Sequence, residues 1–123
     1  MRGRIGLIAF VLLGVAVMCA SKLNQFGVAD VQKITFSSQV KIGGTLLPAG
    51  DYKALHVMEG QEHVMLFQQQ DAPKSKAGYA KVKCTMEPLK EPAKENAAVF
   101  RTEGGVEVLT LLVFKGETAQ HVF

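Results

Sequence analysis

The sequence lacks tryptophan, has only two cysteines and carries none of the common catalytic signatures. Gly-x-Ser-x-Gly, the Walker phosphate loop, His-Glu-x-x-His and Cys-x-x-Cys are all missing, and each of these patterns serves a particular chemistry. With aromatic residues at 7% of the chain, the aromatic platform of a carbohydrate-binding module is also poorly represented. We therefore expect a protein that is not an enzyme and has no cofactor.

Long uncharged apolar runs are absent too, except for one near the start of the chain. Residues 5–18 contain no charge, Arg2 and Arg4 precede them, and the small residues Ala20 and Ser21 follow. This pattern is typical of a secretory signal peptide, and the run is shorter than the ~20 residues that span a bilayer. The pattern predicts a signal peptide over residues 1–21, an exported protein that is periplasmic or secreted, and no transmembrane domain after cleavage.

Two alternatives to a cleaved leader stay open. The apolar run could persist as an uncleaved anchor, or Cys19 could carry a lipid, as in a lipoprotein. The lipoprotein hypothesis is disfavoured because Met18 stands directly before Cys19, where a small residue is expected.

A strong charge of either sign is missing from the predicted mature chain. The whole sequence has a formal charge of +3, but Arg2 and Arg4 belong to the leader, which leaves twelve basic and eleven acidic residues. This near-neutral balance gives no indication of nucleic-acid binding. Cys84 becomes the single cysteine, so the mature chain cannot form an internal disulfide.

Regular glycine punctuation organises residues 22–123, which we expect to form one domain. Short β-prone segments lie between the glycines, and no long stretch has helical periodicity. This spacing predicts an all-β fold, a small antiparallel β-sandwich of about seven to eight strands. The expected strands are 31–36, 39–42, 52–58, 62–68, 79–86, 97–102, 106–114 and 119–123.

Two of these segments have informative patterns. The segment 106–114 is the most apolar, so we place it at the centre of a sheet with both faces covered. The segment 79–86 alternates cleanly, so Ala80, Val82, Cys84 and Met86 should face inward. A buried Cys84 would be an inert thiol.

The stretch from Ile34 to Tyr52 reads ITFS, then VKIGG, then LPAGDY. It resembles a bacterial family of exported domains of unknown function that share an ITFS, V-K-V-x-G, L-x-A-G-x-Y pattern, and the likeness continues to about Gln70. It implies an antiparallel β-sandwich and an exported bacterial protein, and it carries over no catalytic residue. The chain departs from longer family members because it has no tryptophan and no room for their upstream WRTGANE-like segment.

The three histidines supply the one candidate metal site. If Glu59 and Gly60 form a two-residue hairpin loop, His56 lies directly opposite His63, with Cβ atoms ~5 Å apart. Both imidazoles could then reach one metal ion, with a third ligand from His121, Glu62 or Glu117. The simpler interpretation is a cross-strand polar pair, because zinc catalysis uses about three protein ligands.

The sequence thus favours an exported cell-envelope binding or structural module without catalytic activity. Its partner would be an unknown envelope protein, a lipid or a glycan. Contacts could run through sheet edges, the loops 69–76 and 88–96, the Tyr52–Phe67 face if uncovered, or a basic cluster of Lys74, Lys76, Lys81 and Lys83. The alternative is a metal-binding protein or metal-dependent enzyme that uses His56 and His63.

Overall fold

The computed structural model describes residues 8–12 and 23–123, and the described chain is built of strands and turns. The predicted leader, residues 1–21, lies outside the described residues except for β1 (Ile8–Leu12). In residues 23–123 there are ten strands: β2 (Val31–Phe36), β3 (Val40–Ile42), β4 (Thr45–Leu47), β5 (Gly50–Glu59), β6 (Glu62–Gln69), β7 (Tyr79–Lys83), β8 (Thr85–Pro88), β9 (Ala97–Glu103), β10 (Val106–Val113) and β11 (Ala119–Val122). Over this part of the chain, no helix has the length and apolar character to cross a membrane.

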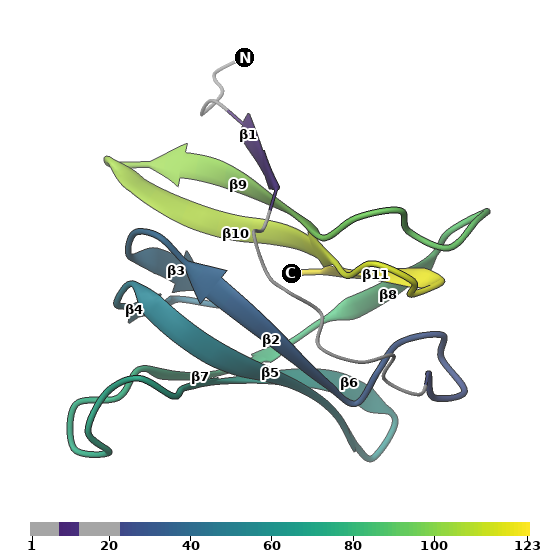
Figure 1. Cartoon of the computed structure of the whole chain (residues 1–123), viewed down its shortest axis with the longest axis horizontal. Coiled ribbons are helices and arrows are strands. Elements are labelled where there is room, and N and C mark those ends of the chain that lie inside the picture. The colour runs from purple at the N-terminus through teal and green to yellow at the C-terminus, as the bar shows by residue number, and fades with distance from the viewer. Residues whose placement is uncertain (1–7, 13–22) are drawn as a thin grey trace.

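The strands form two sheets that pack face to face (Figure 1). One has the order β2-β5-β6-β7, and every neighbouring pair in it is antiparallel. The other has the order β1-β9-β10-β11-β8, with β3 and β4 attached through β10. The predicted all-β sandwich is confirmed. The predicted segment 79–86 is divided between the sheets, because the chain leaves one at β7 and enters the other at β8.

Strand β10 lies at the centre of its sheet, as its apolar sequence predicts. It pairs with β9 along one edge, and its other edge is shared end to end by β3, which is parallel to it, and β11, which is antiparallel. The expectation that both of its faces are covered is wrong. Leu109 and Leu112 are buried in the core, whereas the other side chains of β10 are partly exposed.

The core lies between the two sheets and is built from the inward side chains of both. Its members are Ile34, Phe36, Val40, Ile42, Leu47, Tyr52, Ala54, Met65, Phe67, Ala80, Cys84, Ala98, Phe100, Leu109, Leu112 and Phe114. The face of β5 and β6 that carries Tyr52 and Phe67 therefore packs inside the sandwich. It is not an open contact surface, which removes one of the four contact routes expected from the sequence.

Cys84 stands where the chain passes between the sheets, between β7 and β8. Its backbone N–H donates to the carbonyl of His63 at 3.0 Å, and its side chain joins the core. Burial raises the pKa of the thiol to about 11, so the reactive thiolate is scarce at neutral pH. The predicted inward alternation of the segment is confirmed, since Ala80 and Cys84 are buried and Val82 and Met86 pack against the same cluster.

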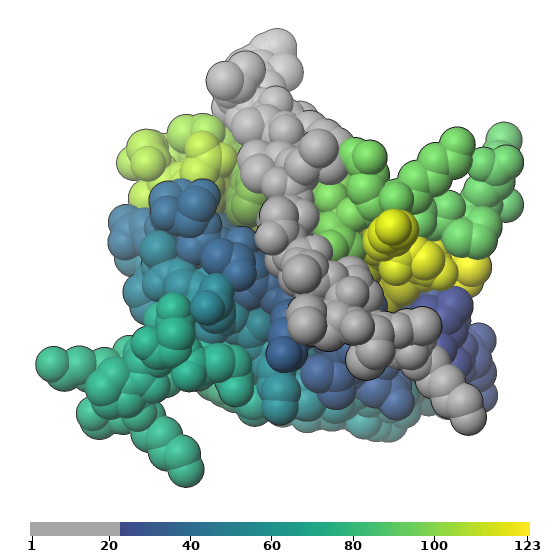
Figure 2. Space-filling model, viewed as in Figure 1, coloured from purple at the N-terminus to yellow at the C-terminus, as the bar shows by residue number. Residues whose placement is uncertain are grey.

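The two predicted loops are connectors that project from the body of the molecule (Figure 2). One links β6 to β7 and carries the exposed Lys74 and Lys76. The other links β8 to β9. The remaining two lysines of the basic cluster are in ion pairs, Lys81 with Glu59 and Lys83 with Glu62. Half of the predicted cluster is therefore neutralised locally.

Candidate functional site

The hairpin of β5 and β6 brings His56 and His63 together, in a register different from the predicted one. Glu59 pairs with Glu62, so the loop is Gly60 and Gln61 rather than Glu59 and Gly60. Met58 stands opposite His63, and His56 stands opposite Met65. The predicted direct opposition of the two histidines is thus wrong, because the turn begins one residue later.

The two imidazoles nevertheless make direct contact as diagonal neighbours on the inner face of the sheet. His56 Nε2 lies 3.1 Å from His63 Nδ1, a distance at which one neutral ring donates its N–H to the other. His56 is buried, and His63 is half-buried at the edge of the core. The pair therefore joins a buried ring to one that is partly exposed.

His121 reaches the same place from the opposite sheet. It lies on β11, points inward and is 1% exposed, and its ring centroid is 5.8 Å from that of His56. Its Nε2 faces Glu117 Oε1 at 3.3 Å. Its Nδ1 is buried without a hydrogen-bond partner. All three histidines of the chain thus gather between the sheets, from β5, β6 and β11.

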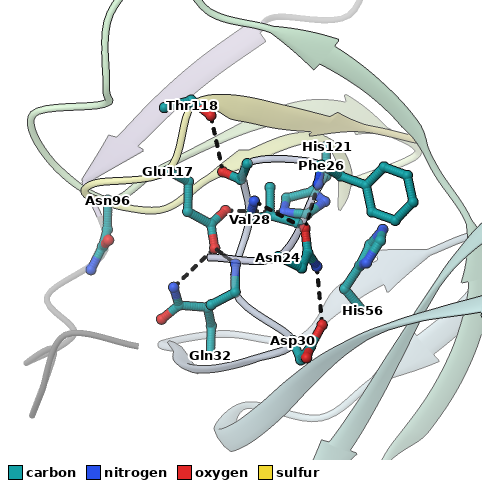
Figure 3. A network of polar contacts seen from close by, with 12 residues as sticks. Asn24, Phe26, Val28, Asp30, Gln32, His56, Asn96, Glu117, Thr118 and His121 are labelled. Carbon is teal, nitrogen blue, oxygen red and sulfur yellow. Dashed lines mark hydrogen bonds and ion pairs between the residues drawn. The ribbon is translucent and has the colours of Figure 1, made fainter. Parts of the chain in front are cut away.

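Glu117 is the most deeply buried charged residue of this region, at 0% exposure. Figure 3 shows the hydrogen bonds of its carboxylate. Glu117 lies in the turn between β10 and β11. Its Oε2 accepts hydrogen bonds from the backbone N–H of Ala29 at 2.8 Å and from Gln32 Nε2 at 3.0 Å. Together with His121, these donors replace the water that a carboxylate loses on burial, which would otherwise cost several kcal/mol, on the order of the penalty for an unpaired buried ion.

The segment that precedes β2 closes this end of the sandwich. Asn24 Oδ1 accepts the backbone N–H of Phe26 at 2.8 Å, which shapes a local turn. The carbonyl of Gly27 accepts the N–H of Thr118 at 2.8 Å. The Phe26 ring then packs edge-on against His63, with centroids 4.6 Å apart. We call residues 24–30 the closing segment, since they cover the histidines and bind the Glu117 turn.

The surroundings of His56 favour its neutral form. Burial is the largest cause of its lowered pKa, followed by the charges that His121 and His63 carry when protonated, while Asp30 and Glu117 oppose the shift. A buried imidazole whose pKa lies below the unfolded value of ~6.5 binds fewer protons in the native state. Protonation of this group therefore favours unfolding.

From that sign we expect acid to destabilise the protein through His56. The stability that neutral, buried His56 contributes should be fully present well above pH 6.5. It should be lost as the pH falls below that value. Urea unfolding of the whole chain at pH 7.5 and pH 5.5 checks this, with His56→Gln as the comparison. The variant should show a smaller difference in unfolding free energy between the two pH values. An equal difference in both proteins would assign the acid sensitivity to other groups.

As a metal site, the predicted pair is present but incomplete. Among the described residues, no group of three His, Cys, Asp or Glu side chains is arranged to hold a metal ion. The third ligands suggested by the sequence are engaged elsewhere: Glu62 pairs with Lys83, and Glu117 accepts three donors. Among the candidate ligands, His56 and His63 are thus the two whose ring nitrogens face each other, at 3.1 Å.

No family model, no curated protein and no solved structure matches the chain. The family resemblance noted from residues 34–70 remains a prediction.

Proposed function

We propose that the protein is an exported, non-catalytic binding module of the cell envelope, and that the ligand of its histidine site is a divalent transition metal ion, zinc or copper(II). The observation that supports the ligand is the 3.1 Å separation of His56 Nε2 and His63 Nδ1. The export part rests on the sequence pattern of residues 1–21, and the fold is of a kind common outside the cytoplasm.

The distance between the two nitrogens suits a shared metal as well as a shared proton. Zinc–imidazole bonds of 2.0–2.1 Å with nitrogens ~3.1 Å apart give a ligand–metal–ligand angle of ~100°, between the octahedral and tetrahedral values. A metal would lie off the line between the nitrogens and would need small rotations of both rings. A metal ion would reach the site past His63, because His63 is half-buried whereas His56 is buried.

The proposal is of binding rather than catalysis because of the number of ligands. Catalytic zinc uses three protein ligands and one open position. A metal-dependent enzyme would need His121 to turn its unpartnered Nδ1 toward the pair, at the expense of its position beside Glu117. The two-histidine site needs no such change.

The test is calorimetric titration of zinc and copper(II) into the protein at pH 7.5. We expect one ion per chain, and we expect His56→Ala, His63→Ala to abolish binding. His63→Asn alone should weaken it at least ~tenfold, the equivalent of ~1.4 kcal/mol. Binding should also weaken toward pH 5.5, since protons compete for the same nitrogens.

Met58→Ala is the matched control, because Met58 stands opposite His63 in the register but offers a thioether rather than an imidazole. It should leave zinc binding unchanged. Circular dichroism of each variant separates lost ligands from lost fold. No heat of binding by the wild-type protein would exclude the metal, and native mass spectrometry of protein from envelope fractions would show separately whether residues 1–21 have been removed.

A structural module is the second candidate, and the buried Glu117 favours it. Its hydrogen bonds tie the closing segment and β2 to the turn before β11, so the cluster could serve only to hold the sandwich closed. In that case the protein would act through its exterior, where Lys74 and Lys76 on the projecting connector remain available to anionic lipid or glycan. Absence of metal binding combined with a stable fold would support this candidate.

A further inference from the structure

The outer edge of β9 differs from the other sheet edges in what covers it. On its inner side β9 pairs with β10, and on its outer side it pairs with β1. The register with β1 is antiparallel and continuous over five residues, from Ile8 opposite Arg101 to Leu12 opposite Ala97. The strand seated on this edge, IAFVL, is apolar at every position.

This covering strand lies within the segment that we propose to be removed on export. If the leader is cleaved, β9 loses its partner and its outer backbone groups become unpaired. An open edge of this kind is a template for another extended chain, unless it is blocked by proline, charge or a bulge. Residues 97–101 contain no proline, and the single charge among them is Arg101.

Both sheets contribute buried side chains to a core cluster within residues 23–123, from Ile34 to Phe114. Strand β1 adds one edge pairing to a sheet that already has β9, β10, β11 and β8. Loss of β1 should therefore leave the fold intact and the edge accessible.

We propose that the outer edge of β9 is a strand-acceptor site, which binds an extended apolar peptide segment of another envelope polypeptide antiparallel to residues 97–101. The inference rests on the proposed export, because the leader strand fills this edge in the precursor. Main-chain hydrogen bonds give such strand addition its affinity, and alternate side chains give it specificity.

The seated strand itself argues for a peptide rather than a second copy of β9. The occupant is uniformly apolar, whereas the second half of β9 carries Arg101 and Glu103, which already form an ion pair with each other. An apolar partner strand like β1 can pair with this edge without disturbing the ion pair between Arg101 and Glu103.

The probe is a synthetic peptide of residues 8–12 flanked by lysines for solubility, titrated into isotopically labelled protein comprising residues 22–123. We expect saturable amide shifts confined to residues 97–103, with a dissociation constant below about 1 mM. The matched control peptide has proline in place of both Ala9 and Phe10, so that one of the two missing N–H groups belongs to the ladder. The full-length chain should not respond, because its own β1 occupies the edge.

The full-length variant Ala9→Pro, Phe10→Pro supplies a second arm. It should free the edge and bind the same peptide, which tests the site even if the shortened chain does not fold. No shifts at residues 97–103 in either protein, equal binding of the proline peptide, or self-association through β9 without peptide would each overturn the proposal. An intact leader on the native protein would instead refute cleavage and leave the peptide result standing on its own.

Discussion

Replacing Glu117 with alanine should destabilise the protein by about 3–5 kcal/mol, because it removes a buried carboxylate that accepts three hydrogen bonds. The change leaves three donors without an acceptor: the backbone N–H of Ala29, the amide of Gln32 and Nε2 of His121. Because a domain of this size has a total stability of about 5–15 kcal/mol, this loss is a large fraction of the total. Urea denaturation at pH 7.5 measures the loss.

Two comparisons separate the buried network from ordinary carboxylate effects. Glu117→Gln retains one acceptor oxygen and should lose less stability than Glu117→Ala. Glu87→Ala removes an exposed carboxylate that accepts from Gln120 Nε2 at 3.0 Å, and it should change stability by no more than ~0.5 kcal/mol. Hydrogen exchange at Ala29 should accelerate only in the Glu117 variants. Similar losses for Glu117→Ala and Glu87→Ala would show that the network contributes little.

The distribution of side chains between the faces of β5 and β6 follows from the sequence, although the register does not. Moving the turn by one residue shifts the pairing by two, and a shift of two keeps every side chain on the same face. The alternation therefore assigns Tyr52, His56, His63 and Phe67 to one face whichever turn forms. Gly60 belongs to the loop in both registers, so local turn chemistry does not distinguish them.

The importance of Glu117 could not be read from the sequence. A charged residue in a Lys-Gly-Glu turn ordinarily faces water, and the sequence suggested it merely as one possible metal ligand. Its burial depends on Ala29, which lies 88 residues earlier in the chain. The closing segment has no alternating apolar and polar pattern that predicts this contact. The enclosure of the histidines is therefore seen only in the structure. The approach of His121 from the second sheet is long-range in the same sense.

The conformation of the closing segment depends on Gly27. This residue has φ +81°, and a Cβ added there would overlap Thr118 Oγ1. We expect Gly27→Ala to cost roughly 2–5 kcal/mol, from left-handed backbone strain and from steric overlap together. Thermal or urea unfolding measures the cost, and faster hydrogen exchange in residues 24–30 should locate the damage at the closing segment.

Gly105→Ala isolates the backbone part of that cost. Gly105 has nearly the same φ, +80°, but no heavy atom lies within 4 Å of the added Cβ. It should lose only about 1–2 kcal/mol, the strain of a left-handed non-glycine residue. In a Thr118→Ala background, which lacks the overlapping hydroxyl but keeps the Cβ at 3.3 Å from the added atom, Gly27→Ala should cost less than in the wild-type protein. If Gly27→Ala costs no more than Gly105→Ala in the wild-type background, the closing segment is not held closely against Thr118.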